Sequence, residues 1–296
     1  MNPVIMHINY GEVRNGRFGK NTVDSICRMA ADIGYDGIEF RGKIPVELQE
    51  LSFREYAELI AEGKKKYGLS DILFGIGVRD CTSADKEIRE KSISDAIEQA
   101  KIASELCGTT VCNTYAAWIT SSISTAPASS YEFHGSAAAT SEEWELTADA
   151  YHQIGKELEK IGVKFAFETH MNYIHDLPHM AKKLVDLIDS PMVGINMDYG
   201  NTFAFPVRPT VEEAIDIYGD KLFYVHLKNS SYIPGTTSRI ATSLSDGQIN
   251  HRAYLEKLRE VGFTGPIGIE APRAGDRVWY AQQDFNYYKA LTECMQ

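Results

Sequence analysis

Four acidic or imidazole side chains end successive strand-like runs in the second half of the chain. These residues are Glu168, Asp198, His226 and Glu270, and each closes a short apolar run: 163–168, 193–198, 222–226 and 266–270. A helical pattern separates each run from the next, so parallel strands of a closed sheet would bring the four side chains together. One such residue could cap a helix or form a salt bridge. Their recurrence in four consecutive units predicts a metal site.

Three carboxylates and one imidazole suit a hard or borderline divalent cation. Oxygen-rich ligation makes Mn²⁺ the first expectation, with Mg²⁺, Co²⁺ and Zn²⁺ as alternatives. Four protein ligands on a six-coordinate ion leave two positions for adjacent oxygens of a substrate, such as a hydroxy-ketone. Such a site would polarise the carbonyl and stabilise the enolate that forms when a neighbouring C–H is deprotonated.

The elements that must position these residues alternate from end to end. Four further strands are expected at 3–8, 37–40, 72–77 and 109–113. Amphipathic helices lie between the strands, with apolar stripes at Ile93, Ile97, Ala100 and Cys107, and at Leu146, Ala150, Ile154, Leu158 and Ile161. Repeated βα units with eight strands predict a single (β/α)8 barrel, and we expect one domain over residues 1–296.

Two segments interrupt this rhythm. The stretch 113–141, rich in small, hydroxyl and aromatic residues, predicts a long loop after the fourth strand, either at the catalytic face or as a plain surface loop. A shorter irregular segment, 229–247, follows the seventh strand. Aromatic residues on segments expected at the mouth could stack on a flat group of a substrate or pack in the core; they are Tyr115, Trp118, Tyr131, Phe133, Tyr173, Tyr199, Phe203 and Tyr232.

Composition narrows the class of partner and compartment. A net charge of −11 argues against a surface that follows a phosphate backbone, so nucleic acid is not an expected partner. No run of about eighteen apolar residues and no leader peptide are visible. We therefore expect no membrane segment and a cytoplasmic location. The five cysteines lack metal-type pairing and are expected to be reduced.

The local sequences around these residues resemble the xylose isomerase-like barrels, a superfamily of sugar isomerases, epimerases and dehydratases. The resembling segments are Gly34–Glu39, Asp198–Asn201, His226–Lys228, Asp246–Asn250 and Gly262–Glu270. The resemblance covers nearly the whole chain. It implies that Glu168, Asp198, His226 and Glu270 bind the metal.

Two positions narrow the expected reaction. In ketose 3-epimerases of this superfamily, the metal-binding Glu of the fifth strand and that of the eighth, here Glu168 and Glu270, also exchange the proton, and a histidine usually lies three residues after the sixth-strand Asp. Here that position is Asn201, which we expect to contact substrate. His170 follows Glu168 by two residues, so it should face the same side. A histidine there is similar to the proposed base of 3-dehydroshikimate dehydratases and of C-glycoside deglycosidase α-subunits, and the alternative role is a hydrogen bond to a metal ligand.

Several other polar residues could serve the same site. Lys228 could stabilise an enolate or form a surface salt bridge, and Arg273 could bind substrate or cap a loop. His7 and Glu39 end early strands and could bind substrate hydroxyls or be structural. His134 and His175 are reserve acid/base candidates.

We therefore expect a divalent-metal lyase that acts on a ketone-bearing sugar derivative by proton abstraction and β-elimination. Its most specific form is C–C cleavage of a 3-oxo-C-glycoside, which by resemblance implies a small β-subunit, with a homo-oligomer as the other assembly. The alternative is a ketose 3-epimerase or sugar isomerase that uses the same metal and enolate. A sugar-binding barrel without catalysis is a more distant alternative, and a repair endonuclease lacks the expected extra histidines and basic face.

Overall fold

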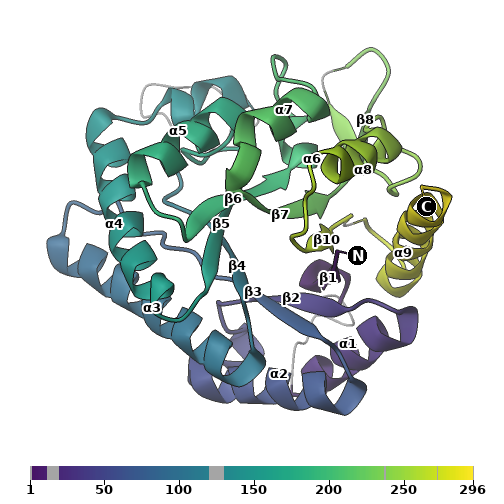
Figure 1. Ribbon diagram of the computed structural model, residues 1–296, viewed down its shortest axis with the longest axis horizontal. Coiled ribbons are helices and arrows are strands. Elements are labelled where there is room, and N and C mark those ends of the chain that lie inside the picture. The colour runs from purple at the N-terminus through teal and green to yellow at the C-terminus, as the bar shows by residue number, and fades with distance from the viewer. Residues whose placement is uncertain (1, 12–19, 120–129, 237, 272, 296) are drawn as a thin grey trace. The chain divides into compact units, whose positions relative to one another are not determined.

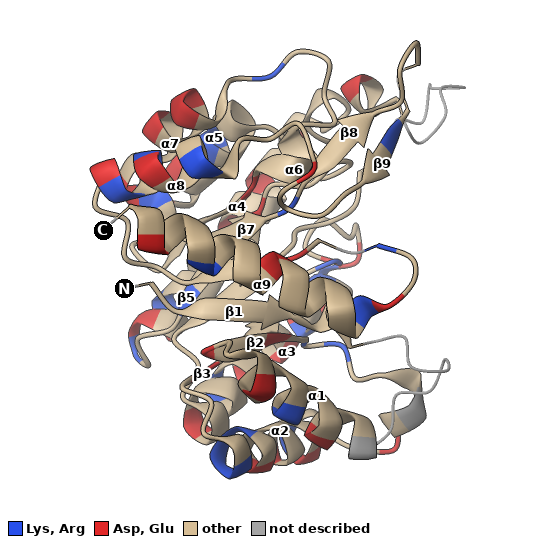
Figure 2. Ribbon diagram, turned by 90° about the vertical axis from the view of Figure 1, so that its right-hand side faces the viewer, with Lys and Arg blue, Asp and Glu red and all other residues tan. Residues whose placement is uncertain are grey.

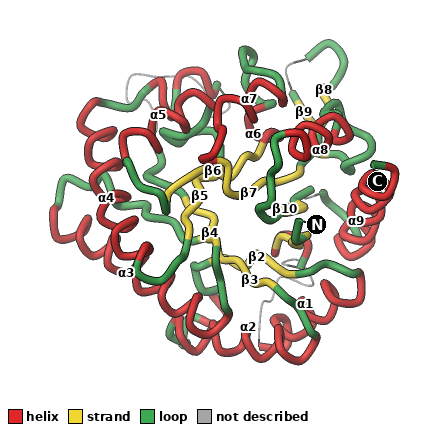
Figure 3. The backbone as a smooth tube through the Cα atoms, viewed as in Figure 1, coloured by secondary structure: helices red, strands yellow, loops and turns green. Residues whose placement is uncertain are grey.

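All eight predicted strands are present and form a barrel. The computed structural model describes residues 2–11, 20–119, 130–236, 238–271 and 273–295. Among these residues, parallel strands close a barrel in the order β1-β10-β7-β6-β5-β4-β3-β2, drawn in Figures 1 and 3. The strands are β1 Val4–His7, β2 Gly37–Arg41, β3 Asp71–Gly75, β4 Val111–Thr114, β5 Lys164–Glu168, β6 Val193–Asp198, β7 Leu222–Leu227 and β10 Ile267–Ile269.

The helices follow the strands as the apolar stripes predicted. They are α1 Lys20–Ile33, α2 Phe53–Tyr67, α3 Lys86–Cys107, α4 Ser141–Glu159, α5 Pro178–Ile188, α6 Tyr199–Thr202, α7 Val211–Tyr218, α8 His251–Glu260 and α9 Arg277–Cys294. Short 3-10 helices are η1 Ile8–Tyr10, η2 Val46–Leu48, η3 Tyr131–Phe133, η4 Gly135–Ala137 and η5 Gly219–Lys221. No helix in the described part of the chain is long and apolar enough to cross a membrane.

The chain divides into two compact units. The first comprises residues 1–72 and 225–296, and the second comprises residues 73–224. In the first unit, β1 pairs in parallel with β2 and with β10, and this register places His7 beside Glu39. Helices α1, α2 and α9 of this unit carry charged residues along their turns (Figure 2).

In the second unit, β4 pairs with β3 and β5, and β5 pairs with β6, all in parallel. Figure 1 shows α3, α4 and α5 along the outside of these strands. Helix α4 begins with a reciprocal capping box, because the Thr140 side chain accepts from the Glu143 amide while the Glu143 side chain accepts from the Thr140 amide. The α4 stripe predicted from the sequence is buried at Ala150, Ile154 and Leu158.

One predicted irregular segment is in fact partly ordered as a hairpin. Within 229–247, β8 Ser230–Tyr232 pairs antiparallel with β9 Arg239–Ala241. The prediction of a loop there was wrong because both strands are only three residues long and no clear alternation of apolar and polar residues marks them. The predicted loop after β4 contains η3 and η4, and its central residues 120–129 lie outside the described part of the chain. Four of the cysteines are buried and Cys294 is exposed, and none forms a disulfide.

Candidate metal centre

Two of the predicted metal ligands end neighbouring strands of the second unit. Glu168 is the last residue of β5 and Asp198 is the last residue of β6. Their side chains are buried, with exposed fractions of 2% and 0%. The Asp198 side chain accepts from the Asn201 amide at 3.0 Å, which also begins the short helix α6. The strand ends therefore deliver both carboxylates to one place.

Neutral donors hold these two carboxylates in position. The Asn201 Nδ2 donates to Glu168 Oε1 at 3.0 Å and to Asp198 Oδ2 at 2.8 Å. The other oxygen, Glu168 Oε2, accepts from Asn113 Nδ2 at 2.8 Å and from the Tyr115 hydroxyl. Hydrogen bonds to the charged form of a carboxylate stabilise that form. Neutral donors therefore orient both oxygens of Glu168.

The other two predicted ligands belong to the first unit. His226 lies in β7 and is fully buried, and Glu270 directly follows β10 with an exposed fraction of 8%. His226 Nε2 lies 2.8 Å from Glu39 Oε2. Because a carboxylate oxygen only accepts, Nε2 must carry the proton, and in the neutral ring this leaves the Nδ1 lone pair available to a metal. His226 Nδ1 lies 3.3 Å from Glu270 Oε2.

Glu270 is surrounded by basic groups. Lys228 Nζ lies 3.3 Å from Glu270 Oε2, and His7 Nδ1 lies 3.9 Å from Oε1. Burial by itself would raise the pKa of Glu270, but His7, Lys228 and His226 together hold it well below its usual value. Glu270 Oε2 is buried and accepts no hydrogen bond from the described residues. An anionic oxygen in this state is a natural ligand for a cation.

The donor set fits one divalent ion. Glu168, Asp198, His226 and Glu270 each offer one ligand atom, and these atoms all lie within 4.8 Å of one another. The described residues thus contain a buried group of Glu, Asp and His side chains that could hold a metal ion.

His170, the predicted base, follows Glu168 by two residues, just after the end of β5. Its Nδ1 is 2.9 Å from the Met171 carbonyl, so Nδ1 donates in the neutral ring and Nε2 keeps its lone pair. Tyr115 and Tyr173 meet the imidazole edge to face, with ring centroids 6.2 and 5.5 Å away. The side chain is partly exposed. This arrangement gives His170 a proton-accepting atom that the backbone does not occupy.

Several of the residues predicted to bind substrate contact other residues of the protein. Glu39 contacts His226, as described above, and His7 Nδ1 accepts from the Asn9 amide at 3.2 Å. Arg273 forms an ion pair with Asp284 at 3.0 Å, and its guanidinium lies 4.2 Å from the centre of the Tyr280 ring. Asn201 joins the two ligands of the second unit. Each of these contacts suits an orienting role as well as the predicted contact with substrate.

The two reserve histidines are buried. His175 is fully buried, with Nδ1 2.7 Å from the Glu168 carbonyl and Nε2 accepting from the Ala116 amide at 3.2 Å. Burial lowers the pKa of His175 to about 3, so the ring is neutral near pH 7. Because both of its nitrogens are used, His175 orients the backbone of Glu168. His134 has an exposed fraction of 4%.

Sequence reasoning missed the amide side chains that hold the ligands. Asn113 was noticed only as the end of a strand, although it donates to Glu168. Asn9 donates from Nδ2 to Glu270 Oε1 at 2.8 Å. The available signal was position, because Asn113 lies near the end of β4 and Asn9 follows β1 by two residues. A polar residue at or just after the end of a barrel strand is therefore a candidate partner for the ligands.

Comparison with known proteins gives the family of this barrel. The model of the xylose isomerase-like TIM barrel family matches residues 27–291, and the chain belongs to this family. An inosose dehydratase from Clostridium beijerinckii is 25% identical over 167 residues, which are 51% of this chain and 55% of that protein. One from Salmonella typhimurium is 25% identical over 156 residues, 48% of this chain and 52% of that protein. The chain thus matches about half the length of these curated relatives.

Solved structures share the fold over the whole chain. A xylose isomerase-like TIM barrel protein from Mycobacterium smegmatis, in complex with magnesium, has a TM-score of 0.75 and 20% identity and covers 100% of this chain and 98% of its own. The probable 3-DHS dehydratase of petrobactin synthesis from Bacillus anthracis has a TM-score of 0.73 and 18% identity, covering 98% and 99%. A D-allulose 3-epimerase from Methylomonas sp. has a TM-score of 0.73 and 15% identity, covering 98% of each chain.

Proposed function

We propose that this protein is a divalent-metal-dependent lyase that acts on a ketone-bearing sugar derivative or cyclitol by β-elimination. The observation that carries the proposal is the difference in hydrogen bonding between Glu168 and His170. Glu168 accepts hydrogen bonds on both carboxylate oxygens, whereas His170 Nδ1 contacts a carbonyl and leaves Nε2 to accept a proton. A neutral imidazole with an available ring nitrogen is a better proton acceptor than a carboxylate committed to a cation.

The reaction needs three tasks from the protein. A bound divalent cation would polarise the ketone and stabilise negative charge on its oxygen, with Mn²⁺ the first candidate and Mg²⁺, Co²⁺ or Zn²⁺ as alternatives. His170 Nε2 takes the proton from the carbon next to the ketone. Lys228, whose Nζ lies 3.3 Å from Glu270, can donate a hydrogen bond to a substrate oxygen.

Elimination then follows from the enolate of the substrate. The C–H electron pair forms the new C=C bond as the group on the β-carbon departs with its own bonding pair, and the carbonyl is re-formed. When the leaving group is hydroxide, protonated His170 can return its proton so that water is released. When the leaving group is the aglycone carbon of a C-glycoside, the same steps break its bond to the sugar, and protonated His170 returns its proton to that carbon.

Two finer forms of this function are open to test. Relatives named dehydratases favour loss of water from a keto-cyclitol or a cyclic keto acid. Cleavage of a 3-oxo-C-glycoside, with a small partner subunit, is the form that the residues around Glu168 and His170 suggested from the sequence. Both need the same base and the same metal.

A 3-epimerase is the second candidate, favoured by the fold shared with the epimerase of Methylomonas sp.. It would form the same enolate and return the proton to the opposite face. The position where such epimerases usually carry histidine holds Asn201, which here bridges Glu168 and Asp198. This departure from the usual epimerase residue favours elimination over epimerisation.

The test is a substrate panel in deuterated water with metal-loaded protein. The panel contains an inosose, 3-dehydroshikimate, a 3-oxo-C-glycoside and simple ketoses. An unsaturated ketone or free aglycone supports the lyase, whereas an epimerised ketose with solvent deuterium and no elimination product supports the epimerase. Ligand binding without deuterium exchange in any compound would favour a sugar-binding barrel.

Substitution of His170 tests the base. His170→Ala should keep metal affinity and lose roughly 10²- to 10⁴-fold in kcat, the usual contribution of general acid–base catalysis. The matched control is His152→Ala, because His152 Nδ1 also lies 2.8 Å from a carbonyl, that of Ile188, but lies on α4. The assignment of the base is wrong if Glu168→Gln abolishes turnover while His170→Ala remains near wild type.

A further inference from the structure

The 3-10 turn after β1 contacts Glu270 at two points. Asn9 Nδ2 donates to Glu270 Oε1 at 2.8 Å, and the next residue, Tyr10, accepts at its hydroxyl from the Ala271 amide at 3.1 Å. Ala271 directly follows Glu270, so the first contact fixes the carboxylate and the second fixes the peptide group beside it. Two adjacent residues of η1 therefore restrain one predicted metal ligand at both its side chain and its backbone.

A fully buried carboxylate on α9 supports this turn. Asp284 has an exposed fraction of 0%, and its Oδ2 accepts from the Tyr10 hydroxyl at 2.6 Å. Its Oδ1 accepts from the Leu244 amide at 3.0 Å, and Arg273 pairs with it at 3.0 Å. One side chain of α9 thus ties together the segments that follow β1, β9 and β10.

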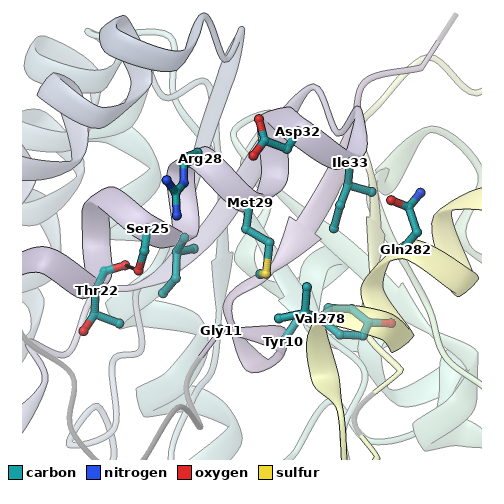
Figure 4. Close-up of a pocket in the computed structure, with 11 residues that line it drawn as sticks. Tyr10, Gly11, Thr22, Ser25, Arg28, Met29, Asp32, Ile33, Val278 and Gln282 are labelled. Carbon is teal, nitrogen blue, oxygen red and sulfur yellow. Dashed lines mark hydrogen bonds between the residues drawn. The ribbon is translucent and has the colours of Figure 1, made fainter.

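The Tyr10 side chain is buried, with an exposed fraction of 3%, and it lines a cavity on one side. A cavity of about 510 Å³ lies between α1 and α9, and Tyr10 is among its lining residues, next to Val278 of α9 (Figure 4). Other lining residues include Ile26, Met29 and Ile33 of α1. Open volume beside a ring removes packing partners that would otherwise fix it. The two contacts of the hydroxyl then contribute much of the restraint on the position of Tyr10.

We propose that Asn9, Tyr10 and Asp284 are positioning residues that hold Glu270 in its metal-binding orientation. None of them needs to touch the metal or the substrate. With Oε1 held by Asn9, Glu270 Oε2 faces His226 Nδ1, 3.3 Å away. Without this restraint the carboxylate can turn away from His226 Nδ1 and keep only its ion pair with Lys228, whose Nζ is also 3.3 Å from Oε2. The inference rests on the proposed metal-dependent function but not on which reaction is catalysed.

The test measures Mn²⁺ affinity of the metal-free full chain by calorimetric titration, together with the electron paramagnetic resonance spectrum of the bound ion. Residues that orient metal ligands typically contribute 10- to 100-fold in affinity, so Tyr10→Phe and Asn9→Ala should each bind about 10-fold more weakly. Tyr10→Phe keeps the ring and removes only the hydroxyl. Asp284→Asn combined with Tyr10→Phe should weaken binding no more than the larger single change, because both interrupt the same chain of contacts.

Tyr35→Phe is the matched control. The Tyr35 hydroxyl is also buried and also donates to α9, to the Ala281 carbonyl at 3.0 Å, but the described contacts do not connect it to Glu270. It should change Mn²⁺ affinity by less than about twofold, because substitutions that share no contact with the ligand act independently of it. Equal Mn²⁺ affinities for Tyr10→Phe, Tyr35→Phe and wild type would overturn the positioning role of Tyr10.

Asn9→Ala keeps the proposal testable if Tyr10→Phe does not fold, because Asn9 is only partly buried. Wild-type affinity with an unchanged spectrum in Asn9→Ala would overturn the positioning role of that residue. A wild-type protein that binds no divalent ion would instead overturn the proposed function and this inference with it. Metal affinity lost in the variants but no turnover of the substrate panel by wild type would overturn only the proposed reaction.

Discussion

Removal of the Glu39 carboxylate should weaken the metal centre through His226. Glu39 has an exposed fraction of 2%, and its Oε2 lies 2.8 Å from His226 Nε2, whose ring is fully buried. Glu39→Ala removes the acceptor that keeps the proton on Nε2. The imidazole then loses both its orientation and its preference for the tautomer that offers Nδ1 to a cation.

The magnitude follows from the burial of this pair. A hydrogen bond to a charged group contributes about 1.5–3 kcal/mol, and each 1.4 kcal/mol is about a factor of ten in affinity. Glu39→Ala should therefore bind Mn²⁺ roughly 10- to 100-fold more weakly, in agreement with the usual effect of such partners. Glu39→Gln keeps a neutral acceptor and should fall between Glu39→Ala and wild type.

The assay is calorimetric titration of metal-free protein with Mn²⁺, with circular dichroism to verify folding. Glu90→Gln is a suitable control, because Glu90 is an exposed partner of Lys86 on α3 and should leave metal affinity unchanged. The reasoning about the tautomer of His226 would be refuted if Glu39→Ala bound Mn²⁺ with the affinity of wild type while remaining folded.

Three further predictions concern the ligands, the buried histidines and the metal itself. Asn201→Ala removes the donor shared by Glu168 and Asp198 and should weaken Mn²⁺ binding about 10-fold, measured by the same titration. Burial lowers the pKa of His175 to about 3 and that of His251 to about 4, so the folded state keeps both neutral while the unfolded chain gains protons below about pH 6.5. Each histidine should therefore lower the free energy of unfolding by about 2 kcal/mol at pH 5 relative to pH 7. In urea unfolding, His251→Asn should lose less stability between these two pH values than the wild type does. An equal loss of stability would contradict the neutral state of buried His251. A metal chelator should lower the melting temperature of the loaded protein, because a ligand that binds only the folded state stabilises it, and excess Mn²⁺ should restore it.

The sequence by itself determined the barrel and its predicted ligands. Strands and helices are distinguished by local periodicity, and the ends of parallel strands lie at one end of a barrel, so a polar residue that closes an apolar run can be placed without coordinates. Glu168 and Asp198 end β5 and β6 as the apolar runs predicted. The hairpin β8–β9 was missed, because its short strands lack a distinct period.

Only the tertiary structure decided which side chains orient those ligands. Asn9 and Glu270 are 261 positions apart in the sequence, Tyr10 and Asp284 are 274 apart, and Glu39 and His226 are 187 apart. No local pattern records such pairs, since each depends on the register of neighbouring strands and on the rotation of a helix about its axis. The tautomers of His170 and His226 follow from these contacts for the same reason. The sequence therefore provided the candidate metal ligands, whereas the three-dimensional contacts specify how their side chains are held.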